Sequence, residues 1–126
     1  MEWNTMLGLT QRLRPDKKYR DYLLITVGCY FGLRVGDLLQ LRWSDLLNQE
    51  DLLITEQKTG KQRKITINPN VTEAVNFCLD KLKCSEDTFI FANRWGSPMT
   101  VSYVNKRLKV IFSQYHVAVK NPSSHT

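Results

Sequence analysis

The chain has 126 residues, of which 42% are hydrophobic, with six glycines and four prolines, and this profile excludes fibrous and low-complexity classes and favours one compact globular domain. Eighteen Lys and Arg against twelve Asp and Glu give a net charge of +6 and a pI near 9.4. This balance favours anionic partners such as nucleic acid, but charge alone does not select that function.

Cysteine and histidine usage argues against a metal site. His116 and His125 do not stand at metal-ligand spacing from any cysteine, so we expect no metal. The longest apolar stretch, 22–33, is too short and too interrupted to cross a bilayer, and the N-terminus has no signal pattern, which predicts a cytoplasmic protein without a membrane partner. Three cysteines without a Cys-x-x-Cys pair lie in apolar periodic segments and are expected to be buried reduced thiols: Cys29, Cys78 and Cys84.

The first third of the chain predicts two helices. Apolar residues recur at helical spacing over 3–13, and Pro15-Asp16 then interrupts the pattern, with Asp16 as the expected N-cap of the next helix. Nearly every residue over 21–31 is apolar, so a helix from Tyr19 to Phe31 should be buried on most sides. Gly32 fits the left-handed position that ends it.

The middle of the chain predicts a short helix and a β-hairpin. A helical stretch over 38–43 is expected to end at Ser44-Asp45. Two extended runs follow, 52–57 and 62–68, and both carry β-branched residues. Because Thr59-Gly60-Lys61 joins them, an antiparallel hairpin is expected.

The last part predicts two amphipathic helices. The spacing over 71–82 is typical of a helix with one apolar face, and 89–98 holds a brief apolar run and a turn. Thr100 can cap a final helix whose apolar face extends from 101 to 115. The tail 121–126 resembles the entry to another helix, with Ser123 or Ser124 as its N-cap. We therefore expect a helix-dominated α+β domain over 1–126 with a small antiparallel hairpin.

Each residue that could carry chemistry also has a structural explanation. Arg34 stands three residues before Asp37, which suits an ordinary ion pair. Lys58 in a hairpin turn can be a solvated charge that protects a sheet edge. His125 can be a surface or packing histidine, and Tyr115 belongs to an apolar stripe.

Taken together, these positions match a known pattern. The run from Gly32 to Asp45, Gly-Leu-Arg-Val-Gly-Asp-Leu-Leu-Gln-Leu-Arg-Trp-Ser-Asp, resembles the first-arginine motif of tyrosine recombinases. Lys58 follows Arg34 by 24 residues, where that family keeps its catalytic lysine. Pro122-Ser-Ser-His-Thr126 resembles the start of the family's His-x-x-Arg motif. The aspartate at 37 replaces a glutamate found in many members and keeps the carboxylate.

The resemblance implies a fold and a function. The expected fold is the DNA breaking-rejoining catalytic fold, incomplete at the C-terminus and without the N-terminal core-binding domain. The expected function is site-specific recombination or integration of a phage or transposon type, through a 3′-phosphotyrosyl link. It implies no metal or nucleotide cofactor, attachment-site double-stranded DNA as the partner, and a full-length parent that assembles as a multimer on DNA.

The resemblance also implies a role for each matched residue. Arg34 would donate two parallel hydrogen bonds to the phosphate, with Asp37 holding its guanidinium in place. Lys58 would supply a proton to the leaving 5′-oxygen, and His125 would contact the phosphate or exchange a proton with the attacking hydroxyl. Further basic residues are expected to contact DNA: Lys61, Arg63, Lys64, Lys106 and Arg107.

The nucleophile of the family follows the His-x-x-Arg motif. Tyr103 and Tyr115 precede His125, so neither is expected to be that nucleophile. The chain is therefore expected to bind DNA weakly, in a salt-dependent manner, without cutting it. Three alternatives remain at this stage: a type IB topoisomerase, which shares the chemistry; a basic non-catalytic nucleic-acid-binding module that also uses Lys109; and a structural or protein-interaction domain. The recombinase interpretation requires Arg34 and Lys58 to converge on one phosphate.

Overall fold

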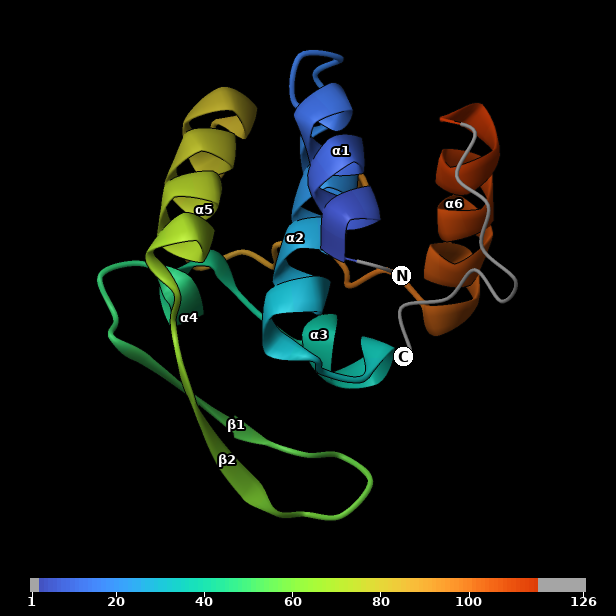
Figure 1. Ribbon diagram of the computed structural model, residues 1–126. Coiled ribbons are helices and arrows are strands. Elements are labelled where there is room, and N and C mark those ends of the chain that lie inside the picture. The colour runs from blue at the N-terminus through green and yellow to red at the C-terminus, as the bar shows by residue number, and fades with distance from the viewer. Residues whose placement is uncertain (1–2, 116–126) are drawn as a thin grey trace.

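The computed structural model describes residues 3–115, which form six helices and one two-stranded sheet (Figure 1). The helices are dominant and the hairpin projects from them, so the expected helix-dominated α+β class is confirmed. In chain order the elements are α1 (Trp3–Leu13), α2 (Tyr19–Phe31), α3 (Val35–Leu38), α4 (Trp43–Leu46), β1 (Asp51–Thr55), β2 (Gln62–Thr66), α5 (Pro69–Leu82) and α6 (Val101–Gln114).

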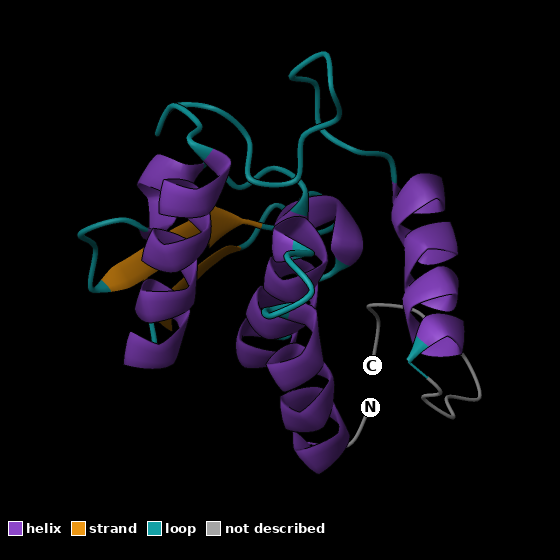
Figure 2. Ribbon diagram, turned by 90° about the horizontal axis from the view of Figure 1, so that it is seen from above, coloured by secondary structure: helices purple, strands orange, loops and turns teal. Residues whose placement is uncertain are grey.

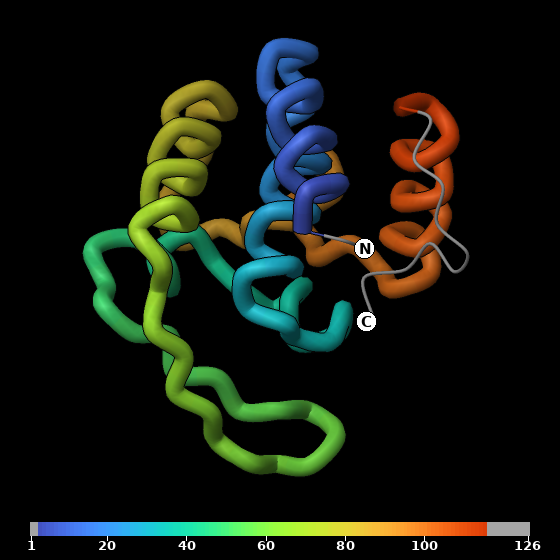
Figure 3. The backbone as a smooth tube through the Cα atoms, in the orientation of Figure 1, coloured from blue at the N-terminus to red at the C-terminus, as the bar shows by residue number. Residues whose placement is uncertain are grey.

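Helix α2 is the central element, and α1 and α5 both pack against it (Figures 1 and 3). Every residue from Asp21 to Val27 is buried, which confirms the prediction made from the apolar run. The helix ends at Gly32 in the left-handed conformation (φ 62°), whose N–H donates to the carbonyl of Gly28. The expected N-cap was wrong: Lys18 precedes the helix, while the Asp16 carboxylate accepts a hydrogen bond from the hydroxyl of Tyr115.

The helical stretch expected over 38–43 was wrong: only its ends are helical, Leu38 as the last residue of α3 and Trp43 as the first residue of α4, and both helices are single turns. Arg42 lies between them in an extended conformation, because it forms an antiparallel bridge with Phe89. The carboxylate of Asp45 then accepts a hydrogen bond from the backbone N–H of Arg42 (2.8 Å). Ser44 and Asp45 therefore lie in the first turn of α4 rather than at the end of a helix.

The predicted hairpin is confirmed. Strands β1 and β2 pair antiparallel, with Asp51 opposite Thr66 and Thr55 opposite Gln62. The connection is longer than expected, because residues 56–61 lie between the paired ends. Of the ten strand residues only Leu52 is buried, so the hairpin extends beyond the helical core toward solvent.

Helices α5 and α6 begin at side-chain caps. Asn68 accepts from the N–H of Asn70, and Thr100 accepts from the N–H of Tyr103, as predicted for the last helix. Figure 3 shows the connection between them passing behind α2. Within residues 3–115, no helix has the length and apolarity needed to span a membrane.

The three cysteines are unpaired, but they do not share one environment. Cys78 is buried, and burial raises the pKa of its thiol to about 12. Cys84 is half-buried and Cys29 is exposed, so the expectation of burial was wrong for these two. In the last turn of α2, Gly28 and Phe31 face the core, whereas Cys29 lies on the uncovered side.

Candidate phosphate-binding site

Arg34 lies at the junction between α2 and α3. It follows the left-handed Gly32 in an extended conformation (φ −68°, ψ 152°) and immediately precedes α3. Its neighbours Leu33 and Val35 are 3% and 0% exposed. Because successive side chains of an extended segment alternate, burial of these two turns Arg34 outward, and its side chain is exposed.

Asp37 joins α3 to the end of the hairpin. It is buried, and its carboxylate accepts a hydrogen bond from the backbone N–H of Gln57 (3.1 Å). No ion pair connects it to Arg34, although the structure describes both side chains. The expected contact between Asp37 and the guanidinium is therefore absent, because the carboxylate turns inward to bind the hairpin.

Lys58 directly follows the residue that Asp37 binds. Its loop is closed by hydrogen bonds from the N–H of Glu56 to the carbonyl of Lys61 (2.9 Å) and from the N–H of Gly60 to the carbonyl of Glu56 (2.8 Å). Gly60 takes a positive φ of 70°, which glycine adopts at little cost. Lys58 is exposed on this ordered turn.

The segments that carry Arg34 and Lys58 are in direct contact. Besides the Asp37–Gln57 hydrogen bond, a Cβ atom at Gly36 would lie 3.1 Å from the side-chain oxygen of Gln57, so the Gln57 side chain lies against the backbone of Gly36. Figure 1 shows the hairpin loop extending beneath α3. Within residues 3–115, neither Arg34 nor Lys58 forms an ion pair, so both charges are available to an anion.

The basic residues in and next to β2 are exposed, but they differ in whether an acidic side chain lies nearby. Arg63 lies 4.0 Å from Glu56, and Lys64 lies 3.5 Å from Asp51. Exposed pairs of this kind are weak. Lys61 has no such partner among the described residues and lies at the loop end of the strand, next to the turn that holds Lys58.

The two DNA contacts predicted on helix α6 lie in different environments. Lys106 is exposed. Arg107 instead forms a bidentate ion pair with the buried Asp21 of α2, with Nη2–Oδ2 and Nε–Oδ1 distances of 2.6 and 3.0 Å. The hydrogen bonds to Asp21 raise the pKa of Arg107. Arg107 therefore fixes α6 to α2 and is not part of the DNA interface proposed below.

The two tyrosines of the last helical segment differ in exposure. Tyr103 is 52% exposed on α6. Tyr115 is buried, its hydroxyl donates to Asp16, and the guanidinium of Arg12 lies 4.7 Å from its ring centre. Burial and the Asp16 carboxylate raise the pKa of Tyr115 to about 12. A hydroxyl in this state is a poor nucleophile, which fits its expected packing role.

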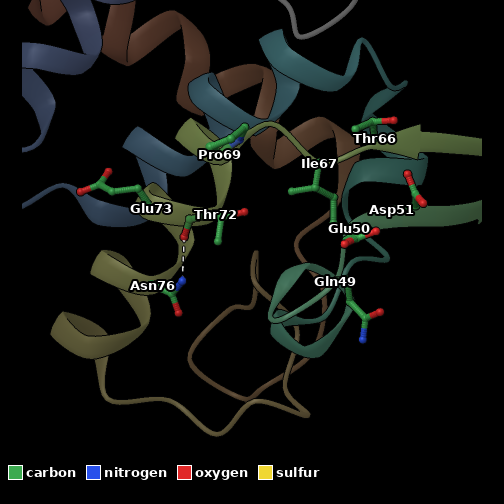
Figure 4. A pocket seen from close by; sticks show the side chains of 9 residues that line it. All are labelled: Gln49, Glu50, Asp51, Thr66, Ile67, Pro69, Thr72, Glu73 and Asn76. Carbon is green, nitrogen blue, oxygen red and sulfur yellow. Dashed lines mark hydrogen bonds between the residues drawn. The ribbon is translucent and has the colours of Figure 1, made fainter.

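A separate open depression of about 680 Å³ lies between the turn before β1 and the start of α5 (Figure 4). Its wall includes three carboxylates, Glu50, Asp51 and Glu73, and none of the predicted site residues. No Lys or Arg lines this wall to bind a phosphate, so the depression is not part of the candidate site.

Two contacts were missed from the sequence. The Gln57 amide gives no sequence signal, because any non-proline residue supplies the same N–H. Asp21 did give a sequence signal, since it is the sole charged residue of the apolar run 21–31 and a carboxylate buried in such a helix requires a partner. His125 lies outside the described residues. Within 3–115, no group of three His, Cys, Asp or Glu side chains could hold a metal ion.

Comparison with known proteins identifies the family. The model of the phage integrase family matches residues 2–126. The chain is 35% identical over 74 residues to the probable integrase/recombinase YoeC of Bacillus subtilis, covering 59% of this chain and 41% of that protein. It is 23% identical over 108 residues to the tyrosine recombinase XerH of Campylobacter jejuni, covering 84% and 30%. The chain thus spans less than half the length of these relatives.

Solved structures show the same fold. The XerA recombinase superimposes with a TM-score of 0.75 at 21% identity, covering 95% of this chain and 44% of that one. A lambda integrase dimer bound to a core site superimposes with a TM-score of 0.68 at 21% identity, covering 99% and 46%. The fold, the motif around Arg34 and the family match agree, and the chain belongs to the phage integrase family, the tyrosine recombinases.

Proposed function

We propose that Arg34 and Lys58 bind the same phosphate of double-stranded DNA in site-specific recombination of the integrase type. The observation that carries this proposal is the hydrogen bond from the Gln57 N–H to Asp37, because it holds the two basic segments together. The exposure of both side chains and the absence of an ion pair at either, within the described residues, support it further.

The chemistry follows from the two cations. The planar guanidinium of Arg34 donates two parallel hydrogen bonds to the phosphate oxygens, on which negative charge grows in the transition state. Lys58 donates a proton to the leaving 5′-oxygen. His125 contacts the same phosphate by family analogy. Asp37 acts through the backbone: it fixes the position of Lys58 rather than the orientation of Arg34.

The 126 residues contain no tyrosine after His125, where the family has its nucleophile. We therefore propose that the chain, as given, binds DNA weakly and does not cut it. Its partner is attachment-site duplex DNA, and the whole protein assembles on it as a multimer. Among the structural relatives, XerH is bound to its difH substrate, and lambda integrase forms a tetramer on a Holliday junction.

A double-mutant cycle tests whether the two cations share one phosphate. Arg34→Gln, Lys58→Gln and the double variant are titrated with duplex DNA, and we expect an interaction energy above about 0.5 kcal/mol, as for residues with a shared partner. The matched control pairs Arg34→Gln with Lys109→Gln, an exposed lysine of α6, and should be additive. Additivity in both cycles would exclude a common phosphate.

The basic non-catalytic module is the second candidate, and the exposed cations of the hairpin and α6 are compatible with it. In such a module each cation contributes separately to binding, so the two cycles give the same result. The outcome of the cycle at Arg34 and Lys58 therefore decides between a built phosphate site and a diffuse basic surface.

A further inference from the structure

The turn over residues 93–97, between α5 and α6, has a fixed shape. The side-chain oxygen of Asn93 accepts hydrogen bonds from the N–H groups of Trp95 (2.9 Å) and Ser97 (3.1 Å). The N–H of Asn93 donates to the carbonyl of Ser97 (2.9 Å), and Ala92 pairs with Pro98. Gly96 takes a positive φ of 83°, which completes the turn.

This turn holds a large apolar side chain in solvent. Trp95 is 75% exposed, and the guanidinium of Arg94 lies 4.5 Å from the centre of its ring. Stacking uses the face of the guanidinium and leaves its N–H groups free at the edge. The pair therefore combines an exposed aromatic ring with guanidinium donors that remain available to a ligand.

The charge around the pair indicates what it binds. The nearest acidic residues before the turn in the sequence are Glu86 and Asp87, and none follows it up to residue 126. The helix that the turn leads into carries the exposed Lys106 and Lys109, whereas its Arg107 is paired with Asp21. Arg94 forms no ion pair within residues 3–115. Basic side chains without an acidic partner attract a polyanion, and most hydrogen bonds between proteins and DNA go to phosphate and sugar atoms.

Backbone contacts with a buried residue anchor the turn directly before α6. The N–H of Met99 donates to the carbonyl of Phe91 (2.9 Å), and Phe91 is 1% exposed. Thr100, the next residue, caps α6. Figure 2 shows the α5–α6 connection projecting beyond the helices before it enters α6. The Trp95–Arg94 pair and the first turn of α6 are therefore held by one short, hydrogen-bonded segment.

We propose that Trp95 and Arg94 form a second contact with duplex DNA, separate from the Arg34–Lys58 site. Arg94 donates to a phosphate, and Trp95 lies on the adjacent deoxyribose with its indole N–H directed at the backbone. The contact is independent of base sequence and positions the first turn of α6 on the duplex. This inference rests on the proposed function, because it requires DNA as the partner.

Substitutions at the turn test the proposal. Binding of a labelled mixed-sequence duplex of about 25 base pairs is measured by anisotropy over a series of salt concentrations. Trp95→Ala should weaken binding about three- to tenfold, and Trp95→Tyr should weaken it less, because an aromatic donor remains. Arg94→Ala should make the negative slope of log affinity against log salt shallower by about one. The matched control is Trp3→Ala, which removes another exposed indole.

The outcomes separate this inference from the proposed function. If Trp95→Ala and Arg94→Ala bind as the unmodified chain does, while Arg34→Gln weakens binding, the second contact is wrong and the phosphate site stands. If the unmodified chain shows no salt-dependent binding to the duplex, both proposals fail. A change in self-association at Trp95→Ala, without a change in DNA affinity, would make the turn a protein contact and overturn the inference. An unchanged melting temperature excludes misfolding as the cause.

Discussion

At the scale of single residues, Asp37 links the two halves of the candidate site through a backbone hydrogen bond. Asp37→Ala should lower the free energy of unfolding by about 1–3 kcal/mol, because the Gln57 N–H loses its partner. It should also weaken DNA binding, because the turn that carries Lys58 is released. Urea denaturation measures the first effect, and hydrogen exchange at the Gln57 amide measures the release.

The matched control for Asp37 is Asp45, whose carboxylate also accepts a backbone N–H, from Arg42, but at the start of α4. Asp45→Ala should cost about 0.5–2 kcal/mol and leave DNA affinity unchanged. Equal losses of DNA affinity in both variants would show that Asp37 contributes to general stability and does not position Lys58.

Tyr115 gives the fold a dependence on alkaline pH. Burial and the Asp16 carboxylate raise its pKa to about 12 from an ordinary value of 10.0. The folded state therefore favours the protonated phenol, and this stabilisation is complete below pH 10 and is lost as the pH rises toward 12. In Tyr115→Phe the unfolding free energy should fall less steeply between these values. Parallel pH profiles of the two proteins would contradict the assignment.

At the scale of elements, α6 is fixed to α2 by the ion pair between Arg107 and Asp21. Asp21→Ala leaves a partly buried guanidinium without its partner, and the expected loss of unfolding free energy is about 1–3 kcal/mol. Lys106→Ala, one residue from Arg107 but exposed, should change it by less than about 0.5 kcal/mol. Similar denaturation midpoints for the two variants would show that the pair contributes little.

The elements were predictable where local signals act alone. The apolar run of α2, its end at Gly32 and the Thr100 cap of α6 are local, and the structure confirms each. The break in the predicted helix between α3 and α4 was not predictable, because it depends on the bridge between Arg42 and Phe89, which are far apart in the chain. Tertiary contacts of this kind override helix propensity.

The same distinction holds for the candidate site. The motif around Arg34 and the spacing to Lys58 locate the two residues in the sequence, and their exposure on ordered backbone agrees with a binding role. The contact made by Asp37 was predicted wrongly, because a carboxylate three residues after an arginine is readily expected to pair with that arginine. Its actual partner is a backbone amide 20 residues away, which no pattern of side chains identifies.

At the scale of the whole molecule, the net charge of +6 should make DNA binding strongly dependent on salt. Exposed basic residues without an ion pair in the described part of the chain include Arg34, Lys58, Lys61 and Lys106. About four phosphate contacts give a slope of log affinity against log salt of about −3.6, a loss of about 150-fold for a fourfold rise in salt.

Two lysines of the hairpin provide the sharpest test of this dependence. Lys61→Gln should make the negative slope shallower by about one, because the Lys61 charge has no acidic partner within residues 3–115. Lys64→Gln should change the slope less, because Asp51, 3.5 Å away, already offsets part of the Lys64 charge. Removing Lys64 also leaves the Asp51 carboxylate without its cation. Equal changes in slope would mean that the Lys64–Asp51 pair opens when DNA binds, and an affinity independent of salt would exclude phosphate contacts as the basis of binding.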